Sequence, residues 1–315
     1  MEYTKEELLS ARKLIEDEIN HTPILQSETL NALTESKIYF KCENLQKAGA
    51  FKYRGATHAV RKMKMKSELR SVATHSSGNH GRALAMAARK NGMSCLIVVP
   101  DNAPTIKIDG MKKEGAELFF CEPTIEARLE KLKEVLNQRE ATVIPPYDHR
   151  DIILGQSTCA QEIIEEIDDL DAIICPVGGG GLLSGTALAA DLLASKVLVY
   201  AAEPEQADDA FRSMKTGKIE PVGNPQTIAD GLRTSLGELT FPIIRDKVEE
   251  IVTVSESEIK SAMRLVLQEL KLVIEASAAV SLAAIIKRPE LFKDKKIAVV
   301  LSGGNVDIDK LSEYL

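Results

Sequence analysis

Nine apolar stretches of strand length recur along this chain of 315 residues, and they constrain its fold more than any other feature. Each stretch is continuously apolar instead of alternating, which is typical of strands buried on both faces of a parallel sheet. The strand segments are KIYFKCE, SVATHSS, SCLIVVP, ELFFCE, TVIPPY, AIICPV, KVLVYAAE, EIVTVSE and KIAVVLSG. Helical patterns fill the intervals between them, and the clearest are residues 79–91, 124–137, 151–167 and 182–194.

This alternation of strands and helices predicts an α/β fold. We expect open, twisted, mostly parallel sheets with helices on both faces. Nine strands are too many for one small sheet, so we expect two sheets in two lobes, with the active site between the lobes. The chain is long enough for more than one hydrophobic core.

The charge balance argues against nucleic acid as a partner. The net charge is −7 and the pI is about 5.5, whereas phosphate backbones require clustered Lys and Arg. The one basic run, RKMKMK at residues 61–66, is typical of a solvated helix end. No apolar stretch approaches the roughly 18 residues that span a bilayer, so we expect no membrane partner either.

Five cysteines are spread along the chain without any CxxC pair. This spacing indicates free thiols in a reducing compartment and not a disulfide framework or a zinc site. The N-terminal segment MEYTKEELLSARKL is amphipathic and lacks the apolar core of a signal peptide. Together these features predict a cytoplasmic protein.

Four consecutive glycines, Gly178 to Gly181, stand between an apolar strand and a helix in CPVGGGGLLSGTALAA. Free backbone N–H groups at a helix start are suited to an anion. The dinucleotide pattern GxGxxG is absent, and the lysine of a P-loop is missing after Gly185. We therefore expect a loop around one compact dianion such as a monophosphate. The alternative is a tight strand–helix turn without a ligand.

Lys52 lies between two aromatic residues in AGAFKYRGATHAV, at the start of a predicted helix. The helix dipole and partial desolvation both disfavour the ammonium form and lower its pKa. A neutral amine is what a Schiff-base lysine must present. The alternative is an ordinary solvated lysine on an amphipathic helix.

Five motifs in this order resemble one enzyme family: AFKYRGA, HSSGNHG, PVGGGGLLSG, IADG and VLSGGN. The chain is similar to pyridoxal-phosphate enzymes of the tryptophan-synthase-β fold type, and within them to the serine racemase and serine/threonine dehydratase group. The resemblance runs through essentially the whole chain. It implies a discontinuous large lobe, residues 1–65 and 150–315, that binds the cofactor. It also implies a small lobe, residues 70–147, that carries the substrate loop.

The resemblance implies how pyridoxal 5'-phosphate would be held. The backbone N–H groups of the glycine run would bind its phosphate, Lys52 would carry the Schiff base, and Phe51 and Gly231 would border the ring. Ser302 would face the pyridine nitrogen, where a hydroxyl protonates the ring only weakly and so disfavours transamination. The implied cofactor-binding residues are Phe51, Lys52, Asn79, Asp148, Gly178, Gly179, Gly180, Gly181, Leu182, Gly231, Glu275 and Ser302.

The resemblance further implies racemisation and dehydration of small hydroxy-amino acids. Lys52 would take the Cα proton on one face, and Ser77 would act as a second proton carrier on the other, since one base cannot invert a centre efficiently. Alternatively, Ser77 only binds the substrate carboxylate. Serine is the first choice of substrate, with threonine or 3-hydroxyaspartate next. The implied substrate-binding residues are Ser76, Ser77, Asn79, His80, Arg128 and Thr234.

Arg82 and Arg128 could pair with a second substrate carboxylate, which keeps 3-hydroxyaspartate open. The segment AAEPEQADDAFRS resembles the family's divalent-cation site, with oxygen ligands from Glu203, Ala207 and Asp209. Such ligands suit Mg²⁺ or Ca²⁺.

The resemblance implies a homodimer, but we carry over no nucleotide regulation, because Glu28 and Ala48 stand where polar contacts would be expected. Three rival functions stay open. They are a dedicated threonine or 3-hydroxyaspartate dehydratase, a β-replacement enzyme such as cysteine synthase, and a catalytically silent amino-acid sensor.

Overall fold

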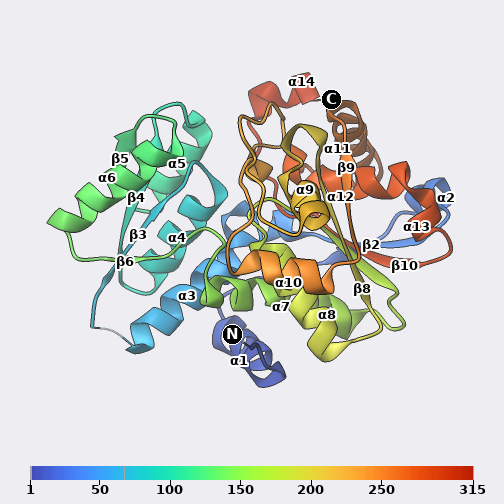
Figure 1. Cartoon of the computed structure of the whole chain (residues 1–315), viewed down its shortest axis with the longest axis horizontal. Helices are drawn as coiled ribbons and strands as arrows, with labels where there is room; N and C mark the ends of the chain where they lie inside the picture. Colours follow the sequence, from blue (N-terminus) through green and yellow to red (C-terminus); the bar gives the residue numbers. More distant parts are fainter. Residues whose placement is uncertain (1, 67, 315) are drawn as a thin grey trace.

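The computed structural model describes residues 2–66 and 68–314, and within these ranges the strands form two sheets (Figure 1). The large sheet has the order β1-β2-β10-β7-β8-β9, and the small sheet has the order β5-β4-β3-β6. The strands are β1 (Ile24–Leu25), β2 (Lys37–Lys41), β3 (Ser71–His75), β4 (Ser94–Pro100), β5 (Glu117–Cys121), β6 (Thr142–Val143), β7 (Ala172–Pro176), β8 (Leu198–Pro204), β9 (Glu250–Val254) and β10 (Lys296–Val300).

All strand pairs are parallel except β1 with β2, which confirms the predicted α/β class with mostly parallel sheets. Each of the nine predicted strands is present. The two-residue β1 was missed, because so short a segment has no detectable period. Strand β6 is shorter than predicted and ends at Val143, since Pro145 and Pro146 follow it and proline cannot donate to a ladder.

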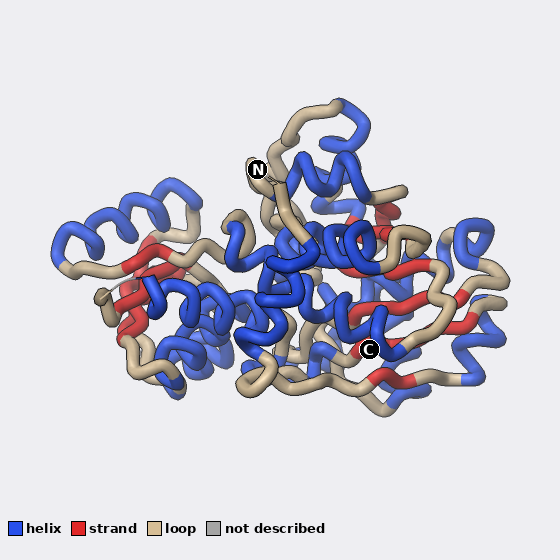
Figure 2. Tube along the Cα trace, turned by 90° about the horizontal axis from the view of Figure 1, so that it is seen from below, coloured by secondary structure: helices blue, strands red, loops and turns tan. Residues whose placement is uncertain are grey.

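Helices connect the strands and cover the sheets (Figures 1 and 2). They are α1 (Lys5–Ile15), α2 (Glu28–Thr34), α3 (Lys52–Lys66), α4 (Asn79–Lys90), α5 (Thr105–Lys113), α6 (Ile125–Gln138), α7 (Arg150–Glu166), α8 (Gly181–Leu193), α9 (Asp209–Thr216), α10 (Thr240–Lys247), α11 (Glu256–Leu270), α12 (Ala276–Lys287), α13 (Pro289–Phe292) and α14 (Leu311–Tyr314). Among the described residues, none of these helices has the length and apolar character that crossing a membrane requires.

Both faces of each sheet are packed against helices. On the large sheet, Ile173 joins the apolar cluster under α7 and α8, and its neighbour Ile174 joins the cluster under α11 and α12. On the small sheet, Val72 faces α3 and α4, whereas Ala73 faces α6. Successive strand residues thus enter opposite cores, as the period of a strand requires.

Helix α3 lies between the two sheets and packs against α4 on one side and α7 on the other (Figure 1). We refer to the elements around the small sheet as the small lobe and to the rest as the large lobe. The lobe boundaries predicted near residues 65–70 and 147–150 stay a prediction. Ligands of open α/β sheets bind at the carboxyl ends of the strands, so the loops after β3, β7 and β10 are where a site is expected.

Candidate active site

The glycine run connects β7 to α8 at the carboxyl edge of the large sheet. A side chain would not fit at Gly179, because an ideal Cβ there would lie 2.3 Å from the ring of Tyr147. Gly180 has a left-handed φ of 88°, which glycine adopts without steric cost. In the described part of the chain no side chain caps α8, so its first N–H groups, with those of the loop from Gly178, are available to an anion.

Lys52 is the first residue of α3, and its side chain reaches back toward the small sheet. Its Nζ donates a 2.8 Å hydrogen bond to the carbonyl of Pro146 and lies 5.1 Å from the centre of the Phe51 ring. Burial lowers the pKa of Lys52 to about 8, although the nearby Glu275 acts in the opposite direction. The neutral amine needed for covalent chemistry is therefore accessible near neutral pH.

The carboxyl end of β10 holds the segment that leads into Lys52. The N–H of Phe51 donates to the carbonyl of Ser302 at 3.0 Å, and Ala50 forms an isolated bridge with Gly303. Ser302 is buried at 2% exposure. The structure thus brings Phe51, Lys52 and Ser302 together from segments 250 positions apart.

Glu275 stands at the start of α12 and is 5% exposed. Its Oε1 accepts a 2.7 Å hydrogen bond from Nδ2 of Asn79, which lies on the small lobe. Its Oε2 has no partner among the described residues. Burial raises the pKa of Glu275 to about 7, while Lys107 and Lys52 pull it down. Two predicted cofactor-binding residues therefore meet across the two lobes.

The loop after β3 has two serines in different situations. The Ser76 hydroxyl accepts hydrogen bonds from the N–H groups of Gly78 (3.2 Å) and Gly81 (3.0 Å), so it shapes the loop. The Ser77 side chain is partly exposed and makes no hydrogen bond within the described part of the chain. Of the two hydroxyls, that of Ser77 is free for a ligand.

His80 is buried behind this loop with one nitrogen engaged and one open. Its Nε2 lies 3.0 Å from the carbonyl of Ile144, and its Nδ1 has no partner in the described residues. Burial, together with the charge of Lys52, lowers the pKa of His80 to about 3. His80 is therefore neutral, and because Nε2–H donates to the carbonyl, Nδ1 is the buried acceptor.

Arg128 on α6 faces the end of β3, where its charge adds to burial in lowering the pKa of His75. Its Nε is buried and has no partner among the described residues. Thr234 lies at the glycine run, because its Oγ1 would be 3.2 Å from a Cβ placed on Gly178. The N–H of Gly231 donates to Ser277 Oγ at 3.0 Å.

Asp148 is engaged at a helix start. Its carboxylate accepts hydrogen bonds from the N–H groups of Glu238, Leu239 and Thr240 at 2.8–3.2 Å, ahead of and at the first residue of α10. This is a capping arrangement. None of its contacts points to a cofactor, and the cofactor role predicted for Asp148 stays a prediction.

The segment predicted to bind a cation contains two deeply buried carboxylates. Glu203 and Asp209 are each 1% exposed. Glu203 accepts from the N–H groups of Phe211 (2.6 Å) and Ala210 (3.2 Å), whereas both oxygens of Asp209 lack a partner among the described residues. Burial raises the pKa of Glu203 to about 9 and that of Asp209 to about 7. No group of three or more His, Cys, Asp or Glu in the described ranges could hold a metal, so a cation here would also need carbonyl and water ligands.

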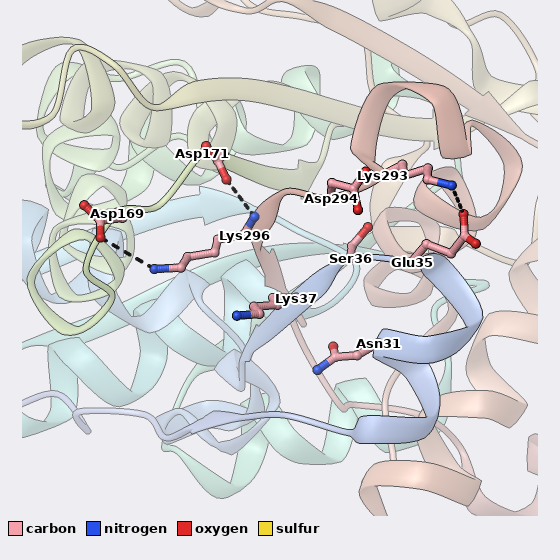
Figure 3. A pocket seen from close by; sticks show the side chains of 9 residues that line it. All are labelled: Asn31, Glu35, Ser36, Lys37, Asp169, Asp171, Lys293, Asp294 and Lys296. Atoms are coloured by element: carbon pink, nitrogen blue, oxygen red, sulfur yellow. Dashed lines mark hydrogen bonds and ion pairs between the residues drawn. The ribbon is translucent and has the colours of Figure 1, made fainter.

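A separate open pocket lies at the opposite, amino edge of the large sheet (Figure 3). Its charges are largely paired with one another, as in Lys296 with Asp169 (3.8 Å) and Lys293 with Glu35 (2.7 Å). Because ligands of such sheets bind at the carboxyl edge, this pocket is not the candidate site. It is lined by Asn31, Glu35, Ser36, Lys37, Asp169, Asp171, Lys293, Asp294 and Lys296.

Sequence reasoning missed three residues of the site. Tyr147 packs on the glycine run, and Lys107 forms an ion pair with Asp230 beside the loop after β3. Asp230 lies in the quoted motif IADG and could have been noticed. Neither Tyr147 nor Lys107 carries a local signal, because only tertiary structure brings them to the site.

Comparisons with known proteins identify the family of the chain. Residues 15–303 match the family model described as pyridoxal-phosphate dependent enzyme. The chain is 45% identical to the serine racemase of Dictyostelium discoideum, over 99% of this chain and 98% of that protein. It is 46% identical to the beta-hydroxyaspartate dehydratase of Paracoccus denitrificans, over 98% of each.

Among solved structures, maize serine racemase superposes with a TM-score of 0.94 at 37% identity, covering 98% of this chain and 96% of that one. The chain belongs to the family of pyridoxal-phosphate-dependent enzymes.

Proposed function

We propose that this enzyme racemises and dehydrates small hydroxy-amino acids, with serine as the first choice and threonine or 3-hydroxyaspartate next. One observation carries the proposal. The amine of Lys52 at the start of α3, with a pKa lowered to about 8, and the unengaged hydroxyl of Ser77 in the loop after β3 are two proton carriers supplied by different segments. The similarity to proteins named serine racemase and beta-hydroxyaspartate dehydratase supports the same substrate class.

The residues present fit the cofactor. A Cβ would fill the cradle at Gly179, and the α8 N–H groups are uncapped in the described chain. The loop from Gly178 to Leu182 would hold the phosphate, Lys52 would hold the cofactor covalently, and Ser302 would face its ring nitrogen. Phe51, Asn79, Gly231 and Glu275 would surround the ring. When bound, pyridoxal phosphate acts as an electron sink that acidifies the Cα proton of an amino acid.

The chain's own residues would direct the outcome. The amine of Lys52 takes the Cα proton of an L-amino acid, and the β-hydroxyl then leaves as water. The released aminoacrylate is hydrolysed by water to a 2-oxo acid and ammonia. A proton delivered by the Ser77 hydroxyl from the opposite side instead produces the D-isomer. The hydroxyl of Ser76 and the backbone N–H groups of Asn79 and His80 at the start of α4 would bind the substrate carboxylate, with Thr234 near the cofactor phosphate.

A 3-hydroxyaspartate dehydratase without racemase activity is the second candidate. The unpartnered Nε of Arg128 favours it, because a guanidinium near the loop after β3 suits a second carboxylate. A β-replacement enzyme would instead need an external nucleophile such as sulfide. An amino-acid sensor would have no need for the buried amine of Lys52.

The test measures D-isomer and 2-oxo acid formation from L-serine, L-threonine and L-threo-3-hydroxyaspartate. Ser77→Ala should abolish D-serine formation from L-serine, by about 10²–10⁴-fold, and leave part of the dehydration. Ser94→Ala, an exposed serine at the start of β4, is the matched control. If Ser77→Ala lowers both reactions equally with both enantiomers, the residue only binds substrate. If the wild type makes no D-isomer, the second candidate holds.

The covalent role of Lys52 has a spectroscopic test. The purified protein should be yellow, and the absence of Trp makes the near-visible band stand out against a low protein absorbance. Lys52→Ala should lose the covalent link and essentially all turnover. A colourless wild type that pyridoxal phosphate cannot reconstitute would contradict the assignment of Lys52.

We propose further that Mg²⁺ or Ca²⁺ binds between Glu203, Asp209 and the carbonyl of Ala207. Two deeply buried carboxylates, one of them without any donor in the described chain, support this. The oxygen-only ligand set excludes neither ion.

The enzyme is also proposed to be a cytoplasmic homodimer. All five cysteines are free thiols, which suits a reducing compartment. Analytical ultracentrifugation of the holoenzyme tests the dimer, and cell fractionation tests the compartment.

A further inference from the structure

Lys107 connects the small lobe to the large lobe beside the site. It lies on α5, and its Nζ forms an ion pair with Asp230, the acidic residue of the IADG motif in the large lobe. The Lys107 side chain is only 10% exposed, whereas Asp230 is 37% exposed. A lysine this buried needs its counter-charge, because an unpaired ammonium in such a place is costly.

The path of Lys107 crosses the loop that carries Ser77. A Cβ placed on Gly78 would lie 2.8 Å from Cδ of Lys107 and 3.3 Å from its Nζ. Gly78 therefore leaves the space through which the lysine reaches Asp230. The loop after β3 and the ion pair are in direct contact, so displacement of one displaces the other.

The charges around Lys107 come mainly from the large lobe. Asp230 and Glu275 both favour its ammonium form and outweigh burial, so that the pKa of Lys107 is raised, while Arg233 acts against them. Both carboxylates approach the ammonium only when the small lobe is seated on the large one. Electrostatic attraction across the boundary therefore favours the closed arrangement.

A second connection between the lobes is centred on the neutral amide of Asn305. Asn305, after β10, donates to Oδ1 of Asn79 at 3.0 Å and accepts from Nη1 of Arg82 at 3.0 Å. This contact fixes α4 against the large lobe. The Lys107–Asp230 pair differs, because both of its members are formally charged.

We propose that the Lys107–Asp230 ion pair is the latch that holds the small lobe closed over the site. Lys107 is then a positioning residue, which keeps the Ser77 loop in place and excludes water from the site. The inference rests on the proposed function only for its kinetic consequence. The latch itself can be measured without any substrate.

The first experiment follows amide hydrogen exchange in the holoenzyme, without substrate. Lys107→Met and Asp230→Asn should each speed exchange in α5 and in residues 76–81, and the double variant should do no more than either single. Lys112→Met, an exposed lysine on the same helix, should have no effect. Additive effects, or a response no larger than that of Lys112→Met, would overturn the proposal.

The second experiment measures kcat and KM for 2-oxo acid formation from the best of the three substrates. Each latch variant should lower kcat/KM by about 10- to 100-fold, with non-additive losses, and Lys107→Arg should recover much of the activity. A loss with Lys107→Met but not with Asp230→Asn, and without faster exchange, would mean that Lys107 binds substrate and is no latch. Absence of turnover with all three substrates would contradict the proposed function, yet hydrogen exchange would still decide the latch.

Discussion

Two clusters of buried charge in the large lobe differ in how their charges are balanced. In the first, Arg54 donates to Glu43 and to Glu162 at 2.6–2.8 Å, and Lys41 pairs with Glu162 at 2.8 Å. Two cations thus face two carboxylates. In the second, Glu203 and Asp209 are equally buried, but only backbone N–H groups reach Glu203 and no donor in the described chain reaches Asp209.

The difference shows that burial alone does not decide the charge of a carboxyl group. Contacts with Arg54 and Lys41 overcome burial and lower the pKa of Glu162. Without a side-chain cation in contact, burial raises the pKa of Glu203 to about 9. In the first cluster, side chains of the fold balance the charges of the carboxylates. In the second cluster, these charges are balanced only when the carboxyls are protonated or a cation is bound.

The first cluster, which contains Arg54, also supports the site. Arg54 follows Lys52 by two residues in the first turn of α3, and its guanidinium fixes that turn to α7 through Glu162 and to the segment after β2 through Glu43. The position of the reacting amine therefore depends on a network that has no chemical role itself.

Removing Arg54 should give the largest effect, because it leaves the buried Glu43 without a cation and removes one of the two cations that contact Glu162. Arg54→Met is expected to lower the free energy of unfolding by about 3–5 kcal/mol, as measured by urea denaturation. Arg12→Met, which removes a surface pair with the exposed Glu165, should cost less than about 1 kcal/mol. Similar losses for the two variants would mean that the cluster contributes no more than surface charge.

Removing the bound cation should give the next largest effect on stability. This effect should depend only on the second cluster, which contains Glu203 and Asp209. A cation at about 100 times its Kd stabilises the folded state by about 2.7 kcal/mol, so chelation should lower Tm, and Mg²⁺ or Ca²⁺ should restore it. Asp209→Asn should abolish this response, while Asp246→Asn, whose carboxylate is exposed and paired with Arg245, should keep it. A chelator without effect on Tm or activity would remove the proposed cation site.

The pH dependence of the chelated protein should have a definite sign. The folded-state pKa values of Glu203 and Asp209 are raised to about 9 and about 7. Their contribution to stability is therefore fully present below the unfolded values near pH 4 and is lost as pH rises through the folded ones. Between pH 5 and pH 9, the Tm of the chelated protein should therefore fall, because these carboxyls are ionised in the unfolded chain over this range and resist ionisation in the folded one.

Bound cation should flatten this decline, and so should Glu203→Gln. Glu162, whose pKa is lowered, provides the opposite dependence, since its contribution is lost as pH falls. A chelated wild type whose Tm rises from pH 5 to pH 9 would contradict the assignment.

The sequence predicted what depends on local pattern. Continuous apolar runs identified nine strands, and the glycine run predicted a cradle whose need for small residues is visible at Gly179 and Gly180. It did not predict the partners that distant segments supply. The pairing of Lys107 with Asp230 joins positions 123 apart, and Tyr147, which follows β6 of the small sheet, lies against Gly179 in the loop after β7 of the large sheet.

Asp148 is another residue whose partners come from a distant segment and were not predicted from the sequence. The family resemblance places Asp148 at a cofactor-binding position. In the structure, its three N–H donors come from residues 90 to 92 positions further along the chain. No spacing rule foresees a side chain that caps a helix so remote in sequence. The role of a carboxylate therefore depends on which hydrogen-bond donors the fold places beside it.

Substitution of Asp148 therefore has the smallest expected effect. It is also the most discriminating test of the comparison between the two clusters. Its carboxylate is supplied with backbone N–H donors, like Glu203, but it is only partly buried and needs no cation. Asp148→Ala should cost about 1 kcal/mol of unfolding free energy through loss of the α10 cap, with the chelator response unchanged. The affinity for pyridoxal phosphate, measured by fluorescence titration of the apoenzyme, should also stay as in the wild type. Weaker cofactor binding without a loss of stability would assign Asp148 to the cofactor. It would also show that the number of hydrogen-bond donors around a carboxylate does not distinguish a structural role from a ligand-binding one.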